Sequence, residues 1–198
     1  MDINEIKLNS VSMADKVYEI LNLIEYGFMK NRMEFLTTAL QEETEVNKLE
    51  RALADNIMTI AKTTPDKKEL SSLAQMVEML ERMGDEATGL IERIEVKVSE
   101  RLLFSEEAVK QFNETYKTMK DSVQMMREYL RKKDETLKKK IVDNGFRVKE
   151  MVENYRREHA DRLVRGECTP MGANMYFDML DFTGNLARHA SNIVKLVQ

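Results

Sequence analysis

Apolar side chains recur three and four residues apart along most of the chain, which is the spacing of one face of an α-helix. Alternating strand patterns are nearly absent, and seven glycines and two prolines are few for the turns of a β-protein. The sequence therefore predicts an all-α fold. The clearest apolar stripe consists of Leu73, Met76, Val77, Leu80, Ala87, Leu90, Ile91, Ile94 and Val98.

Short polar breaks divide this pattern into six long helices. Thr63–Asp66 ends one helix and starts the next, Ser105 precedes two first-turn acids, and Thr169 precedes Pro170. Serine and threonine cap helix N-termini, and proline is favoured at the first helical position. A helix of about 30 residues is about 45 Å long, so we expect an elongated body. The expected helices span residues 3–29, 31–62, 67–99, 105–131, 134–164 and 170–197.

A weak internal repeat relates the two halves of the chain. Met13–Val17 is similar to Met119–Val123, and Ala87–Leu90 aligns with Ala190–Ile193. Repetition of this kind indicates a duplicated structural unit. We expect two similar antiparallel three-helix bundles, residues 1–102 and 103–198.

Composition argues against several classes of protein. The formal net charge of −4 lacks the basic excess of a nucleic-acid-binding protein. No stretch approaches the ~18 uninterrupted apolar residues of a membrane span, and the acidic N-terminus has no signal-peptide layout. The single cysteine, Cys168, cannot form an internal disulfide, as is usual in a reducing cytosol. Met1 is either a natural start or a boundary after a missing membrane portion.

Catalytic signatures are missing from the sequence. It contains no glycine-rich phosphate loop, no His-Glu-x-x-His and no Gly-x-Ser-x-Gly motif. Neither His159 nor His189 has a glutamate three residues earlier, which excludes the ferritin-like di-iron ligand set. We interpret both as partly buried helix residues, and we expect His159 to tie the fifth helix to its neighbour. These absences argue against the enzyme classes that use those motifs.

Two pairs of polar residues have the spacing of one helix turn. Glu81 and Asp85 lie four apart in the third helix, as do Glu43 and Asn47 in the second. If these helices pack antiparallel, three carboxylates and one amide oxygen face a shared point. Hard cations prefer such oxygen ligands, so a metal site is one interpretation.

The other interpretation of these acids is a solvated helix face. Arg82 lies four residues from both Glu78 and Glu86 and could neutralise them. Gly84 and Gly89 lie inside the same strongly periodic helix, where glycine costs about 1 kcal/mol relative to alanine. We expect close helix approach at both, and at Gly184 in the sixth helix.

Six basic residues lie within the ten positions Arg131–Lys140. Such a run either touches an anionic membrane surface or an acidic partner, or forms a solvated corner.

Several motifs resemble those of one family. Leu80–Asp85 resembles the L-E-R-I-G-D signature of PhoU proteins. Arg157–Leu163 and Gly166–Pro170 together resemble the H-x-x-R-L-x-x-G-x-C-x-P stretch of PhoU-like domains in bacterial sodium/phosphate cotransporters. Tyr176–Leu180 and His189–Ile193 continue this match, which spans nearly the whole chain.

This resemblance implies a cytoplasmic, non-enzymatic regulator of phosphate uptake and phosphate signalling. The expected partners are a phosphate transporter or its membrane domain, a sensor histidine kinase, and a second copy in a homodimer. A place at the inner face of the membrane is also implied, and nucleic acid is not an expected partner.

The resemblance also implies where a metal would bind. Some PhoU proteins hold iron or other metals through E/D-x-x-x-D motifs, one site per bundle. The matching residues here are Glu43, Glu81 and Asp85, with Asn47 where an aspartate is usual. We therefore expect any iron, zinc or manganese ion in the first bundle only.

The second bundle departs from the family pattern. Its matching positions hold no carboxylate, and two of them carry a positive charge, which disfavours a metal. These positions are Gly145, Lys149, Gly184 and Arg188.

Two other functions remain open from the sequence. One is a metal-dependent helical-bundle enzyme or metal store, which requires a full ligand set. The other is a plain helical dimerisation scaffold, although the interior glycines and the 3.6-residue period argue against long coiled coils.

Overall fold

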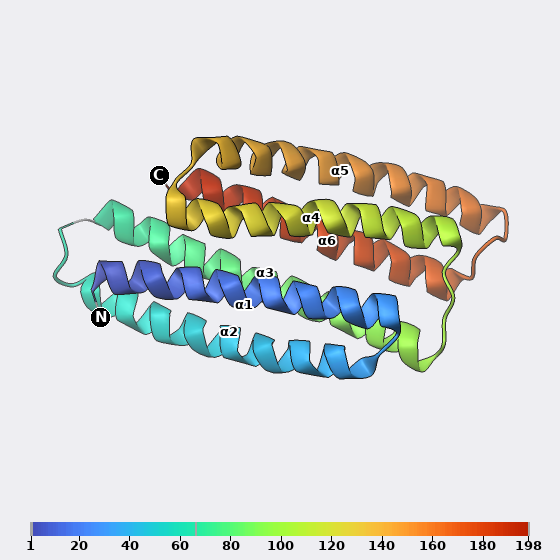
Figure 1. Cartoon of the computed structure of the whole chain (residues 1–198), viewed down its shortest axis with the longest axis horizontal. Coiled ribbons are helices and arrows are strands. Elements are labelled where there is room, and N and C mark those ends of the chain that lie inside the picture. The colour runs from blue at the N-terminus through green and yellow to red at the C-terminus, as the bar shows by residue number, and fades with distance from the viewer. Residues whose placement is uncertain (1, 66, 198) are drawn as a thin grey trace.

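Six long α-helices run back and forth along one axis in a computed structural model that describes residues 2–65 and 67–197 (Figure 1). The all-α prediction is confirmed, and the described residues contain no strand. The helices are α1 (Ile3–Lys30), α2 (Met33–Ile60), α3 (Lys67–Ser99), α4 (Glu106–Lys132), α5 (Glu135–Val164) and α6 (Pro170–Leu196).

Local caps define most helix ends. The Ser105 hydroxyl accepts the Ala108 N–H at 3.2 Å, and the Thr169 hydroxyl accepts the Gly172 N–H at 3.1 Å, as the sequence predicts. The second helix is shorter than expected at both ends. Asn31 adopts a left-handed conformation with φ of 51°, which ends α1 and delays α2 to Met33. Asp66, expected in the next break, lies outside the described residues.

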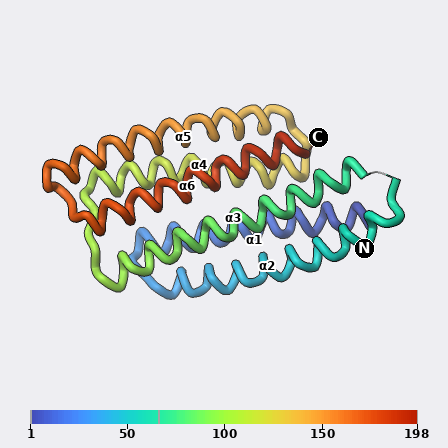
Figure 2. The backbone as a smooth tube through the Cα atoms, turned by 180° about the vertical axis from the view of Figure 1, so that it is seen from behind, coloured from blue at the N-terminus to red at the C-terminus, as the bar shows by residue number. Residues whose placement is uncertain are grey.

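The helices form two groups of three. Helices α1, α2 and α3 all pack against one another, and so do α4, α5 and α6. The groups meet mainly through α3 and α6, which lie side by side in both views, and through α1 and α4 (Figures 1 and 2). The division of the chain into two duplicated domains stays a prediction.

Polar contacts reinforce the junction between the two groups. The buried Tyr116 hydroxyl in α4 donates to the Leu21 carbonyl in α1 at 2.8 Å. On the other side, Arg93 in α3 pairs with Asp178 in α6 at 2.8 Å. A buried hydroxyl with a hydrogen-bond partner avoids the cost of an unsatisfied polar group, so these contacts fix the register of the helices.

Of the three glycines at which close approach was expected, Gly89 has the nearest neighbour. A Cβ atom on this residue would lie 2.5 Å from the Phe182 ring of α6. At Gly184 the nearest atom would be 3.4 Å away, and at Gly84 the nearest atom, in Val46, would be 3.6 Å away. The expectation of unusually close approach therefore holds at Gly89, whereas Gly84 makes only an ordinary van der Waals contact.

None of the described helices has the length and apolar character that crossing a membrane requires.

Candidate functional site

The acidic residues predicted as a site lie on the adjacent helices α2 and α3. The Glu43 carboxylate lies beside Gly84, with one oxygen 4.0 Å from the position of a Cβ atom on that glycine. Asn47 donates from its side-chain nitrogen to the same Glu43 oxygen at 2.6 Å. Asp85 is exposed and Glu81 is half-buried on the neighbouring turn of α3. We call these four residues the acidic face.

Repulsion between carboxylates acts at this face. Burial raises the pKa of Glu81, and the negative charges of Asp85 and Glu50 raise it further, with a smaller contribution from Glu43. Sequence analysis missed Glu50, although its distance of seven residues from Glu43 is two helix turns and was the available signal. The neighbouring carboxylates thus add to the effect of burial on Glu81.

Arg82 neutralises only one of its two expected partners. Its guanidinium pairs with Glu78 at 2.6 Å, as the solvated-face interpretation predicts. Glu86 instead accepts a hydrogen bond from Asn185 in α6 at 3.1 Å, and its carboxylate lies 4.0 Å from His189. Burial raises the pKa of Glu86. The expected Arg82–Glu86 pairing is therefore wrong, because the helix face that carries Glu86 turns toward α6.

The donor set of the acidic face is incomplete for a metal as it is arranged. Across residues 2–65 and 67–197, no three His, Cys, Asp or Glu side chains lie together in a way that could hold a metal ion. The amide nitrogen of Asn47 points to Glu43, and a nitrogen that donates its proton cannot ligate a cation. No chemical step is therefore assigned to a metal at this face.

The corresponding residues of the second group line one groove between α5 and α6. Gly145, Lys149, Gly184 and Arg188 all border this space, whose volume is about 630 Å³. Lys149 lies 3.8 Å from Glu153 in the same helix, and Arg188 donates to Asn185 at 3.2 Å. The structure thus places cations at this face, where the first group has carboxylates.

A buried polar network joins α4, α5 and α6. Arg162 donates to His159 Nδ1 and to Gln111 Oε1, each at 2.9 Å, and the Tyr176 hydroxyl donates to the same Gln111 oxygen at 3.1 Å. The His159 ring stacks on Tyr176 with centroids 4.2 Å apart, which confirms that it ties α5 to its neighbour. Burial lowers the pKa of His159 to about 4, with a further contribution from the Arg162 charge.

These observations define the class of protein. It is an all-α protein of two three-helix groups, with an acidic face on the first group and a cationic groove on the second. Residues 11–94 match the family model described as the PhoU domain. No curated protein sequence matches the chain.

Solved PhoU structures share the fold over nearly the whole chain. PhoU from Pseudomonas aeruginosa superimposes with a TM-score of 0.91 at 16% identity, covering 98% of this chain and 94% of that one. The phosphate transport system regulatory protein PhoU from Streptococcus pneumoniae gives 0.84 at 13% identity, covering 98% and 92%. A PhoU-like protein from Shewanella oneidensis gives 0.70 at 14% identity, covering 97% and 96%. The finer resemblance to cotransporter domains stays a hypothesis.

Proposed function

We propose that this protein is a non-enzymatic regulator of phosphate uptake and phosphate signalling that acts by contact with a phosphate transporter or a sensor histidine kinase. The observation that carries the proposal is the match of residues 11–94 to the PhoU domain model, within a fold shared with solved PhoU proteins. One of those proteins is described as a regulator of a phosphate transport system. Homodimer formation and a place at the inner face of the membrane stay predictions.

The acidic face is the surface that we assign to this contact. Burial raises the pKa of Glu81, the negative charge of Asp85 raises it further, and Asp85 itself is exposed. Complementary charges steer association and select partners. A partner that presents lysine or arginine side chains here would relieve the repulsion. Recognition through this face is therefore electrostatic and weakens as salt concentration rises.

Phosphate uptake tests the proposed function directly. Expression of the chain in a bacterial strain that lacks its own PhoU should lower the initial rate of radiolabelled phosphate uptake. Asp85→Lys should lose this effect, because it reverses a charge at the proposed contact. Glu150→Lys is the matched control, since Glu150 is an exposed acid on α5 outside the acidic face, and should behave as wild type.

Two results would count against these assignments. If the folded wild-type chain leaves uptake unchanged, the regulatory function is wrong for that transporter system. If Asp85→Lys restrains uptake as well as wild type does, the function stands and the acidic face is not the contact surface.

The stability of Glu81→Gln tests the metal interpretation. Because the pKa of Glu81 is raised in the folded state, its ionised form destabilises the fold as pH rises through that pKa. Without a bound metal, Glu81→Gln should stabilise the protein at pH 7 by about a few tenths of a kcal/mol, the scale of like-charge repulsion one turn apart. With a metal held by this carboxylate, the same change should destabilise the protein and remove the ion.

Thermal unfolding with and without chelator, combined with elemental analysis, distinguishes the two cases. Glu78→Gln is the control, since it removes an exposed acid from the same helix and breaks only the pair with Arg82. One equivalent or more of iron, zinc or manganese that is lost in Glu81→Gln would establish the metal site despite the incomplete donor set.

A further inference from the structure

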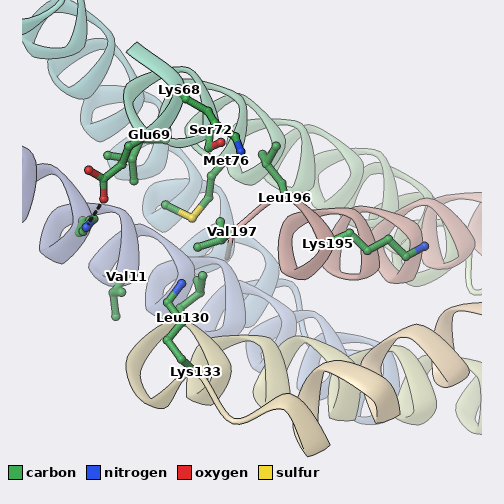
Figure 3. Close-up of a pocket in the computed structure, with 12 residues that line it drawn as sticks. Val11, Lys68, Glu69, Ser72, Met76, Leu130, Lys133, Lys195, Leu196 and Val197 are labelled. Carbon is green, nitrogen blue, oxygen red and sulfur yellow. Dashed lines mark ion pairs between the residues drawn. The ribbon is translucent and has the colours of Figure 1, made fainter. Parts of the chain in front are cut away.

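A pocket of about 500 Å³ opens at one end of the molecule, between helices from both three-helix groups. This is the end at which α1 and α3 begin and α4 and α6 finish (Figure 1). Its apolar lining comes from all four of these regions. The apolar residues are Val11, Leu73, Met76, Leu130, Leu196 and Val197 (Figure 3).

Lysines surround this apolar lining. Figure 3 shows Lys68 and Lys133 on opposite sides of the pocket, while Lys7 reaches Glu69 in an ion pair. Partial burial lowers the pKa of Lys133, and the positive charges of Lys7 and Lys138 lower it further. The pocket is therefore positively charged at its edge, with one lysine paired to the carboxylate that lines it.

The basic turn between α4 and α5 lies at the same end. Within Arg131–Lys140, the exposed cations include Lys132, Lys139 and Lys140, and the acids are Asp134 and Glu135. Together with the four lysines that line the pocket, these residues concentrate positive charge at this end of a chain whose formal net charge is −4. Such a charge distribution orients the molecule toward an anionic surface.

Exposed apolar side chains accompany these cations. Leu8, in the second turn of α1, is 70% exposed, and Met58, in the last turn of α2, is 61% exposed. Leu103 and Val164 are exposed at the opposite end, so apolar exposure alone does not distinguish the two ends. The combination of lysines, a lined pocket and exposed apolar groups occurs at the end that holds the basic turn.

We propose that this end docks on an anionic phospholipid surface, with the lysines over head-group phosphates. The pocket then binds the apolar segment of one lipid that adjoins its head group. Interfacial protein surfaces combine basic and apolar groups in this way. Lysine ammonium groups act as point charges on flexible stems, and clusters of them are attracted to anionic lipid head groups. The basic cluster consists mostly of lysine. This proposal is independent of the proposed regulatory function.

Flotation of the full chain with lipid vesicles tests the proposal. Vesicles of phosphatidylcholine containing phosphatidylglycerol should retain roughly tenfold more protein at low salt than pure phosphatidylcholine vesicles, and high salt should release most of it. Lys132→Glu/Lys139→Glu/Lys140→Glu should abolish the difference. The matched control Lys110→Glu/Lys117→Glu/Arg157→Glu makes the same change in charge away from this end and should bind as wild type.

A second variant tests the apolar contribution. Leu8→Ser/Met58→Ser changes only exposed side chains, so the fold is retained, and it should reduce the binding that survives high salt. The lipid proposal is wrong if the wild type binds neither vesicle, binds both equally, or binds as well after the lysine changes. Retention on immobilised polyaspartate without vesicle binding would assign this end to an acidic protein instead.

Discussion

Gly89→Leu is expected to destabilise the protein by about 2–3 kcal/mol, the upper part of the range for added volume in a packed interior. A Cβ atom at this position already falls 2.5 Å from the Phe182 ring, and leucine adds three further carbons. Because the atoms that it meets are the tip of the Phe182 ring, either this ring or α3 must move at the main contact between the three-helix groups. For a chain of this size the melting temperature should fall by about 5–10 °C.

Gly84→Ala is the control for this prediction. It lies in the same helix, and its new Cβ would meet only ordinary contacts at 3.6 Å or more. Removal of an interior helix glycine gains up to about 1 kcal/mol, so this variant should be at least as stable as wild type. Equal melting temperatures for Gly89→Leu and wild type would show that α3 and α6 do not press together at Phe182.

Acidification is expected to destabilise the protein between pH 7 and pH 5. The pKa of His159 is lowered to about 4 in the folded state, against an ordinary value of 6.5. The unfolded chain therefore takes up a proton first, and stability present above pH 6.5 is lost as pH falls toward 4. For this histidine alone the loss from pH 7 to pH 5 is about 2 kcal/mol.

Burial is the larger cause of the lowered pKa of His159, and the charge of Arg162 adds to it. The Arg162 guanidinium donates to His159 Nδ1, so protonation would place two cations in contact inside the protein. His159→Gln keeps an acceptor for Arg162 and cannot titrate. Urea unfolding at several pH values should therefore show a shallower acid loss in this variant. The loss that remains should come largely from His189, whose pKa is also lowered to about 4 by burial. If His159→Gln and wild type lose the same free energy of unfolding between pH 7 and pH 5, protonation of His159 does not destabilise the fold.

Sequence analysis predicted the helices well because their signals are local. Apolar periodicity and the caps at Ser105 and Thr169 act over one or two turns. They can therefore be recognised from the sequence without knowledge of the fold. The start of α2 was missed because the left-handed conformation of Asn31 has no strong sequence signal there. Asparagine adopts this conformation more readily than most residues, but not often enough to predict it.

The candidate site was only partly predictable. One-turn spacing placed Glu81 and Asp85 on the same face of α3. Spacing along the sequence does not identify a partner on another helix. Glu86 accepts a hydrogen bond from Asn185, which lies 99 residues away. Of the interior glycines in α3, sequence could not show that Gly89 meets a ring whereas Gly84 meets smaller groups. The lysine-edged pocket also needed the fold, since its residues come from four separate segments.

The two three-helix groups also bear on the order in which the chain folds. Within each group, helices that follow one another along the chain pack together, so these contacts close short loops and form quickly. The α3–α6 contact joins residues such as Glu86 and Asn185 only after the chain between them is ordered. We therefore expect each group to be a kinetic folding unit, with docking of the two groups as the later step. Changes at the α3–α6 contact would then alter chiefly the rate constant of unfolding.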